Sequence, residues 1–307
     1  MSRARRIARY LRRMFPPQKM VPAGVAGALA VHLGLQALAG VDPLQVPWRL
    51  WIAAASVVLF MLLLRVYDEL KDAEGDLRLA RSGDARFARR PLVTGEVRLG
   101  DLVLLRDAVI AALVLLNLPL GSPLPYAAFA AALILAWLSS RWFFWPAIAD
   151  HLLLALVTHN PLSLVFSAYV AAVYAADFGA AGLNGWAAVL LVGLWLPVTA
   201  WELARKVRLP AEETDYSTYS KVLGWRLAAL LPGAATAASA ACLIAVALRL
   251  GLGPAYPLVL AAAAALVAGA GLRLRLAPAP GRAELGRWSE LYALVATPGL
   301  VLALLIG

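Results

Sequence analysis

Charged residues are scarce in this 307-residue chain, at 15% against roughly 25% in soluble domains. Cysteine is scarcer still: Cys242 stands alone, which excludes an intrachain disulfide and a cysteine metal cluster. The three histidines are scattered. The sequence also lacks a P-loop, a G-x-S-x-G nucleophile motif and an H-E-x-x-H zinc motif. Enzymes recognised by those motifs are therefore excluded.

Hydrophobic residues are what the chain has instead, at 62% against about 45–50% in soluble domains. With a mean hydropathy of +0.76, this composition predicts a polytopic membrane protein. A membrane helix needs about 20 mostly apolar residues. Nine segments satisfy this requirement: 21–40, 48–67, 100–119, 123–143, 147–175, 184–205, 222–249, 254–274 and 287–306. The predicted fold class is an all-α membrane protein, a nine-helix bundle around a central cavity, with a kink at Asn160-Pro161.

The basic residues predict how these spans are oriented. If the N-terminus is cytoplasmic, all of the 28 Lys and Arg residues except Arg49, Arg106 and Arg249 belong to the cytoplasmic side. Such a bias predicts a cytoplasmic N-terminus and an external C-terminus. It also explains the net charge of +10 without nucleic acid as a partner. We expect an integral protein of a bacterial inner (cytoplasmic) membrane, with the lipid bilayer as its surroundings.

The charges divide the chain into an arm and one domain. Residues 1–20 are predicted to form a basic amphipathic arm on the cytoplasmic surface. Because no small-residue cleavage site follows them, we do not interpret them as a cleaved signal peptide. Residues 21–307 predict a single transmembrane domain. Its charges gather in two loops on the same side, 66–99 and 202–221. A functional site is therefore expected to face the cytoplasm.

Acids at helical spacing open the first charged loop: Asp68, Glu69, Asp72 and Asp76. Residues spaced in this way share one face of a helix. Clustered carboxylates repel one another, and a divalent cation offsets that cost. Mg²⁺ typically binds through one or two carboxylates plus substrate phosphates. The alternative is a solvated helix end whose acids pair with neighbouring Lys and Arg residues.

The sequence FARRPLVTGEV at 87–97 favours the phosphate interpretation. Arg89 and Arg90 can bind phosphate oxygens in bidentate fashion. Pro91 and the Thr94-Gly95 pair predict turns, so this segment is expected to form a shaped loop.

Together these motifs resemble those of the UbiA family of intramembrane prenyltransferases. That family has nine helices, an N-D-x-x-D-x-x-x-D motif at the end of the second, and an R-P-L-x-[ST]-G loop after it. Asp68 stands in the Asn position, the three Asp positions hold Glu69, Asp72 and Asp76, and RPLVTG at 90–95 matches the loop. The resemblance implies Mg²⁺-dependent binding of an isoprenyl diphosphate and prenyl transfer to a hydrophobic or aromatic acceptor.

The family's second acidic motif, roughly D-x-x-x-D after the sixth span, is altered here. Glu202 fits its first acid, Lys206 replaces the second, and TYSKVLG at 218–224 resembles its ending. In one interpretation Lys206 neutralises diphosphate oxygens in place of a second metal, and Glu202 either orients Lys206 or binds metal. In the other, the site is degenerate and the chain binds a lipid or catalyses other chemistry.

The resemblance assigns roles to these residues. The set assigned to metal is Asp68, Glu69, Asp72, Asp76 and Glu202. The set assigned to the diphosphate is Arg89, Arg90, Arg205, Lys206, Arg208 and Lys221. The set assigned to catalysis is Asp72, Lys206 and Arg141.

Aromatic and polar residues near the spans are candidates for the cavity. Trp137 and Arg141 replace the family's Y-x-x-x-K, and could shield a carbocation and contact phosphate, or could belong to an interfacial aromatic belt. Polar residues of the fifth span either line an acceptor pocket or form interhelical hydrogen bonds. The set assigned to the acceptor cavity is Tyr67, Trp137, His151, His159 and Asn160.

Two other functions fit the same sequence. A UbiA-type terpene cyclase would capture the cation internally and need no acceptor. A membrane transporter or lipid-binding protein would release no pyrophosphate. Transporters carry their functional charges near the bilayer midplane, whereas here the charges gather at one surface, which favours an enzyme.

Overall fold

The computed structural model describes residues 2–279 and 281–306, and no strand occurs in that part of the chain. Its elements, in chain order, are α1 (Arg3–Met14), α2 (Pro17–Leu38), α3 (Trp48–Lys71), α4 (Ala73–Arg81), α5 (Ala85–Ala88), α6 (Leu99–Asn117), η1 (Leu118–Leu120), α7 (Pro123–Ser140), η2 (Trp142–Phe144), α8 (Ala147–Asp150), α9 (Leu152–His159), α10 (Leu162–Phe178), α11 (Gly185–Ala204), η3 (Pro210–Glu212), α12 (Tyr219–Leu223), α13 (Trp225–Ala228), α14 (Leu231–Arg249), α15 (Ala255–Leu276) and α16 (Gly286–Ile306). The predicted all-α class is confirmed.

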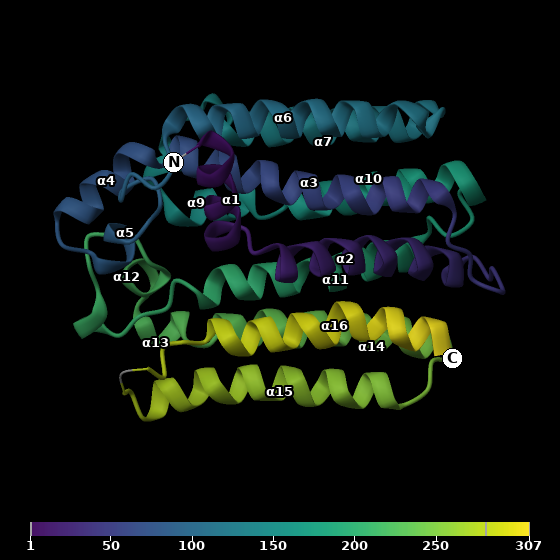
Figure 1. Cartoon of the computed structure of the whole chain (residues 1–307). Helices are drawn as coiled ribbons and strands as arrows, with labels where there is room; N and C mark the ends of the chain where they lie inside the picture. Colours follow the sequence, from purple (N-terminus) through teal and green to yellow (C-terminus); the bar gives the residue numbers. More distant parts are fainter. Residues whose placement is uncertain (1, 280, 307) are drawn as a thin grey trace.

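The long helices lie side by side along a common direction (Figure 1). Helices α2, α3, α10 and α11 occupy the middle of the bundle, where α2 packs on the other three. Helices α6 and α7 flank them on one side, and α14, α15 and α16 on the other. Helix α1 lies at one end of the bundle and α16 finishes at the other.

Eight helical segments in the described residues are long and apolar enough to cross a membrane. They coincide with eight of the nine predicted spans. The remaining predicted span, 100–119, does form a helix, α6, beside α3 and α7. Helix α6 is too polar to count among the apolar membrane-crossing helices because it carries Asp101, Arg106 and Asp107. The count of nine membrane spans, like the orientation, therefore stays a prediction.

The kink predicted in the fifth span is present. Helix α9 ends at His159 and α10 begins at Leu162, with Asn160 and Pro161 between them. Proline causes this break because it lacks an amide hydrogen and its ring clashes with the preceding helical turn. The break exposes backbone and side-chain groups of Asn160 to neighbouring helices.

A buried aromatic and polar cluster fixes the middle of the bundle. Phe60 of α3 stacks on Phe166 of α10, with ring centroids 4.7 Å apart. Beside them, the Tyr169 hydroxyl donates to Asn117 Oδ1 at 2.6 Å, and Asn117 Nδ2 donates to Ser56 Oγ at 2.8 Å. Because each buried polar group finds a partner, the cluster joins α3, α6 and α10 without leaving an unsatisfied group.

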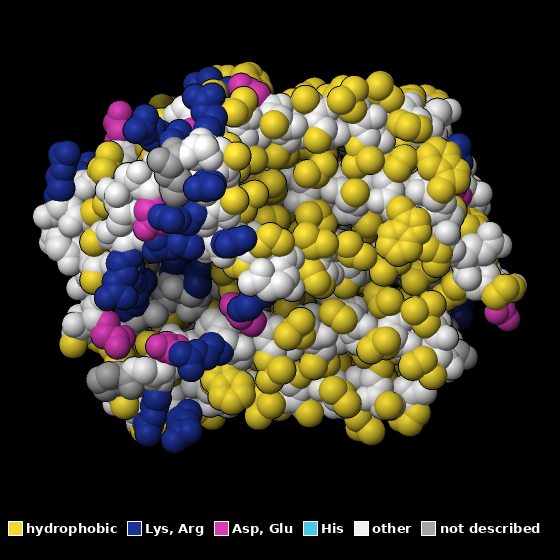
Figure 2. All heavy atoms as spheres, viewed as in Figure 1, with side chains coloured by type: hydrophobic (Ala, Val, Ile, Leu, Met, Phe, Trp, Pro, Cys, Tyr) yellow, Lys and Arg dark blue, Asp and Glu magenta, His cyan; other side chains and the backbone are white. Residues whose placement is uncertain are grey.

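Lys and Arg side chains gather at one end of the bundle, whereas hydrophobic side chains cover the rest of the face in view (Figure 2). We call this the charged end; it carries α1, α4, α5, α12 and α13. The few charges at the opposite end include Arg49, which pairs with Asp177 at 2.6 Å. The two loops predicted to share one side of the membrane therefore do lie at one end of the protein.

Helix α1 packs on the protein at the charged end. Arg6 donates to both oxygens of Asp101 in the first turn of α6, at 2.6 and 2.8 Å, and Arg3 adds a contact at 3.2 Å. The same carboxylate accepts from the Arg98 amide at 3.1 Å and so caps α6. Tyr10 is fully buried. The arm predicted to lie on the membrane surface thus has one side held by the bundle.

Replacing Asp101 with alanine is expected to lower the melting temperature by several degrees. Its side chain is 1% exposed, so the change removes a helix cap and leaves Arg6 without its carboxylate. Thermal unfolding of the purified protein measures the effect. Glu284→Ala is the control, because Glu284 and Arg287 form a highly exposed pair that contributes little. Equal melting temperatures for the two variants would contradict the docking role of Asp101.

Candidate active site

The acids after the second membrane helix continue one hydrogen-bonded helical path. The Asp72 amide donates to the Asp68 carbonyl at 3.0 Å, and the Asp76 amide donates to the Asp72 carbonyl at 2.8 Å. Asp72 follows the last residue of α3 and precedes the first of α4. The negative charges of Asp68 and Asp76 both act on Asp72, so the three carboxylates lie close together although α3 and α4 are separate helices.

Glu69 lies apart from that series. Its side chain is fully buried and accepts a hydrogen bond from Arg65, one turn earlier in α3. The buried Tyr10 of α1 is within electrostatic range of both. Within the described residues, Glu69 Oε1 has no hydrogen-bond partner. Glu69 thus sits in the contact between α1 and α3.

Asp72 is the member of the series that forms no ion pair with any described residue. Burial raises the pKa of Asp72 to about 6, and the negative charges of Asp68 and Asp76 act in the same direction. Lys71 and Arg90 oppose this shift. An additional cation placed beside Asp72 would therefore stabilise the charged form of its carboxylate.

Arg90 connects the acids to the phosphate loop predicted at 90–95. It forms an ion pair with Asp76, and its guanidinium carbon lies 4.4 Å from the centroid of the buried Phe87 ring. The predicted turn is present: the Thr94 amide donates to the Arg90 carbonyl at 2.9 Å, and Gly95 has a φ of +75°. Arg89 is exposed beside it, and the Arg89 carbonyl accepts from Arg13 of α1 at 2.7 Å.

The second charged loop begins with a compact cluster at the end of α11. Glu202 accepts from Arg205 Nε at 2.5 Å and from Lys206 Nζ at 3.0 Å. Lys206 is only 12% exposed, and its ammonium lies 5.7 Å from the ring centroids of Tyr216 and Tyr219. Glu202 therefore orients two cations, which is one of the two arrangements expected from the sequence.

The other basic residues assigned to the diphosphate lie within this loop. The Arg208 amide donates to Ser220 Oγ at 2.8 Å, while Arg208 Nε is buried without a partner in the described part of the chain. Lys221 is exposed, and its ammonium donates to the Thr214 carbonyl, which closes the loop between α11 and α12.

The two charged loops are tied together by side chains far apart in sequence. Asp84 caps α5, accepts from Arg86 Nη2 at 2.9 Å, and accepts from the Thr214 hydroxyl at 2.7 Å. The rings of Phe87 and Tyr216 pack 5.2 Å apart. Hydrogen bonds, chiefly from Arg86 and Thr214, lower the pKa of Asp84 to about 2, so its carboxylate stays charged at neutral pH. The loops therefore form one surface over the charged end.

A cavity of about 490 Å³ lies beside this surface, between α3, α6 and α7. Its lining is Tyr67, Leu70, Lys71, Val103, Arg106, Asp107, Ile110, Trp137, Ser140 and Arg141. The structure thus brings together Tyr67, Trp137 and Arg141, which were predicted to line a cavity. The Trp137 ring meets Phe144 edge-on at 5.6 Å, so Trp137 belongs to both the cavity and the local aromatic cluster.

Lys71 is a site residue that sequence reasoning treated only as a salt-bridge partner. It lines the cavity, and its ammonium lies 2.8 Å from Asp68 Oδ1 and 4.3 Å from the centroid of the Trp142 ring. Asp68 in turn interacts electrostatically with Arg205 of the second loop. The spacing of Tyr67 and Lys71, one helical turn apart, was the signal that could have placed Lys71 in the cavity.

The polar residues of the fifth span do not line this cavity. His159 Nε2 contacts the Ser139 carbonyl at 3.1 Å, with its ring against two aromatic rings of η2. Asn160 Oδ1 accepts from the Thr199 hydroxyl at 2.6 Å, and its carbonyl accepts from Trp195 at 3.2 Å. His151 is exposed where α8 ends. His159 and Asn160 thus form interhelical hydrogen bonds, the alternative to an acceptor pocket.

Replacing Asp84 with alanine is expected to separate the two charged loops. The change removes a helix cap and the hydrogen bond from Thr214. We therefore expect protease to cleave both loops several-fold faster. Limited proteolysis with mapped cleavage sites measures this. Glu74→Ala, an exposed acid of the first loop, is the matched control. Unchanged cleavage in Asp84→Ala would show that the tie does not hold the loops.

Comparison with known proteins identifies the fold. No protein-family model and no curated protein matches this chain. Among solved structures, the apo structure of a UbiA homolog from Aeropyrum pernix K1 is similar to this chain, with 20% sequence identity and a TM-score of 0.64. The alignment covers 92% of this chain and 98% of the homolog. A digeranylgeranylglyceryl phosphate synthase matches 98% of this chain and 99% of its own, with 11% identity and a TM-score of 0.54. The chain has the UbiA fold, which confirms the predicted resemblance at the level of structure.

Proposed function

We propose that this protein is an intramembrane prenyltransferase of the UbiA type. It transfers an isoprenyl group from a prenyl diphosphate to a hydrophobic or aromatic acceptor and releases pyrophosphate. The observation that carries the proposal is the convergence of the two charged loops at one end of the bundle, where the bond from Thr214 to Asp84 joins them next to a cavity. Leaving-group chemistry on a lipid diphosphate needs this combination of acids, cations and apolar space.

The first acidic series suits Mg²⁺ when a diphosphate supplies the remaining ligands. No three described acids, histidines or cysteines are grouped closely enough to hold a metal by themselves. Mg²⁺, however, characteristically uses one or two carboxylates plus substrate phosphates. Asp72 forms no ion pair with a described residue and has a raised pKa. Asp68 is paired with Lys71 but is 49% exposed, so its carboxylate stays open to a cation and completes such a donor pair. Bound there, Mg²⁺ would polarise the diphosphate as a leaving group.

The other acids have different roles in this proposal. Glu69 already accepts from Arg65, and Glu202 already accepts from Arg205 and Lys206. We therefore assign Asp68 and Asp72 to the metal, with Asp76 holding Arg90. Glu69 stays buried in its pair with Arg65, and Glu202 orients the cations of the second loop.

The basic residues bind the diphosphate and stabilise the charge that develops on it. Arg90 and Lys206 lie on opposite loops, each held by a carboxylate, so both present donors without further ordering. Arg205 adds charge on the second loop, while Arg89, Arg208 and Lys221 strengthen the positive field around them. Lys206, held by Glu202, places a cation where the second acid of the family motif would hold a metal.

The cavity between α3, α6 and α7 receives the reacting end of the prenyl chain. Its aromatic walls, Tyr67 and Trp137, present ring faces to an allylic cation, and Lys71 and Arg141 border it on the side of the diphosphate. Exclusion of water protects the cation until the acceptor attacks. In the membrane orientation predicted from the distribution of Lys and Arg, the charged end faces the cytoplasm, and residues 1–20 form the arm beside it.

A direct assay tests the proposed function. Purified full-length protein is incubated with Mg²⁺, prenyl diphosphates of increasing chain length, and aromatic or lipid acceptors, and pyrophosphate is measured. Mg²⁺-dependent release together with a prenylated acceptor supports the proposal. Release that needs no acceptor and yields a cyclic hydrocarbon points to a terpene cyclase instead. Absence of release with every diphosphate would contradict the enzymatic proposal.

A further inference from the structure

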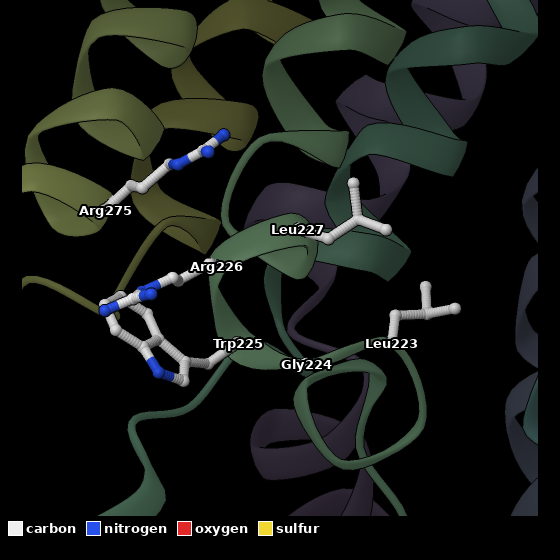
Figure 3. A pocket seen from close by; sticks show the side chains of 6 residues that line it. All are labelled: Leu223, Gly224, Trp225, Arg226, Leu227 and Arg275. Atoms are coloured by element: carbon white, nitrogen blue, oxygen red, sulfur yellow. The ribbon is translucent and has the colours of Figure 1, made fainter.

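A second cavity, of about 440 Å³, opens at the charged end between α13 and the last turn of α15 (Figure 3). Its lining is Leu223, Gly224, Trp225, Arg226, Leu227 and Arg275. It shares no lining residue with the cavity between α3, α6 and α7. None of the acids or cations assigned above to prenyl transfer lines it.

The position of Arg275 follows from a close helix contact one turn earlier. A Cβ on Gly271 would lie 2.2 Å from the Ala229 carbonyl oxygen, so only glycine permits α15 to approach the chain just after α13. Leu274 is fully buried in the same contact region. Since residues four apart share a helix face, Arg275 is carried to the edge of α13.

The two arginines of this cavity have no carboxylate partner among the described residues. Figure 3 shows their side chains extending in opposite directions from the two neighbouring elements. The Arg226 guanidinium carbon lies 5.5 Å from the centroid of the Trp225 ring. The nearest acid in sequence to Arg275, Glu284, is paired with Arg287. Two uncompensated guanidinium groups beside one cavity favour an anion, and their forked donors match phosphate oxygens.

The surroundings of the cavity are apolar and exposed. Leu227 is 49% exposed and Leu276 is 74% exposed, so both present side chains to the lipid chains around the bundle. Tryptophan is enriched at the boundary between membrane and water, where Trp225 would sit. The ligand must therefore combine a negatively charged group with an apolar body next to it.

We infer that the cleft between α13 and α15 binds the phosphate of an anionic phospholipid. Basic pockets between membrane helices recognise such headgroups. The exposed side chains of Arg226 and Arg275 turn toward the phosphodiester on binding, Trp225 lies at headgroup level, and the acyl chains run along Leu227 and Leu276. The bound lipid fixes the turn at Gly224, which has a φ of +78° and joins the second charged loop to α13.

Native mass spectrometry of the full-length protein tests this inference. The purified protein is titrated with phosphatidylglycerol or with phosphatidylcholine, and the bound lipid is counted. We expect preferential retention of phosphatidylglycerol, reduced on the order of 30-fold in the Arg226→Gln/Arg275→Gln double variant. The matched control is Arg273→Gln, which removes an exposed arginine from the same helix end outside the cavity and should retain the lipid.

Further arms separate the sources of the phosphate group and check folding. Equal binding of phosphatidylcholine by the wild type, or equal lipid retention by the double variant and the control, would overturn the inference. Excess inorganic phosphate that displaces phosphatidylglycerol from the wild type would identify a free anion as the ligand and overturn it too. Because the replaced side chains are exposed, the double variant and the wild type should have the same melting temperature when phosphatidylcholine is the only lipid present.

Discussion

Replacing Asp72 with asparagine is expected to lower Mg²⁺-dependent pyrophosphate release by roughly 10³-fold, the scale of losing one preorganised charge contact in a transition state. Asparagine keeps the size of the side chain and removes the negative charge that we assign to the metal. Pyrophosphate release at saturating diphosphate measures the loss. Release that persists unchanged in the variant would contradict the assignment of Asp72.

The same variant is expected to be at least as stable as the wild type. The pKa of Asp72 is raised to about 6 in the folded protein, above its ordinary value. An acid with a raised pKa binds protons more tightly when folded, so its charged form destabilises the fold at neutral pH. Asparagine removes that cost, and the difference shrinks as the pH falls through the raised pKa of about 6 and is gone below the ordinary value of 3.8. Loss of activity with an equal or higher melting temperature therefore separates chemistry from folding.

A control variant lies in the same loop. Glu74→Gln removes an acid that is exposed and forms no ion pair with a described residue. We expect its pyrophosphate release and its melting temperature to match the wild type. A comparable loss of activity in Glu74→Gln would show that the loop needs its total negative charge rather than the carboxylate of Asp72.

The fold could be predicted from sequence because its signal is repeated in every helix. Apolar runs of membrane-spanning length gave eight spans that the structure reproduces, including the break at Pro161. Helix α6 shows where hydropathy alone is weak: Asp101, Arg106 and Asp107 lie within it, yet Asp101 is satisfied by α1 and Arg106 pairs with Asp107. The hydropathy of one segment does not reveal partners that another segment supplies.

The candidate site was predictable only where its residues are close in sequence. Helical spacing gave Asp68, Asp72 and Asp76 on one side, and turn residues gave the loop at 90–95. The pairing of Glu69 with Arg65 was equally local, at one helical turn, but either orientation of Glu69 satisfied the pattern. In the structure Glu69 is fully buried, and burial depends on packing by other segments, which the spacing within α3 does not reveal.

Long-range contacts supplied the rest of the site. The tie from Asp84 to Thr214 joins residues 130 positions apart, and neither has a distinctive local pattern. His151 and His159 were both assigned to the acceptor cavity, and a spacing of eight would put them on one face of a continuous helix, but the helix breaks at His151 between α8 and α9. Their separation in the structure follows from that break, since a helical spacing has meaning only within one continuous helix.

Replacing Lys206 with methionine is expected to lower turnover roughly 10²-fold or more. Lys206 is largely buried, held by Glu202, and bordered by two tyrosine rings, so its charge acts in a region where water screens it poorly. Steady-state kinetics of pyrophosphate release measure the effect. The matched control is Arg81→Gln, an exposed basic residue of the first loop, which should leave turnover unchanged.

The division of the Lys206 effect between kcat and KM decides between the two interpretations of the altered second motif. A lysine that replaces a second metal acts on charge that develops as the C–O bond breaks, so its loss lowers kcat. Loss of a lysine that only attracts the diphosphate raises KM and leaves kcat unchanged. Lys206→Asp extends the test, because it restores the acidic spacing of the UbiA family beside Glu202. If Lys206 stands for a metal, this variant should regain turnover over Lys206→Met only at higher Mg²⁺. Wild-type kinetics in Lys206→Met would show instead that the second motif takes no part in the reaction.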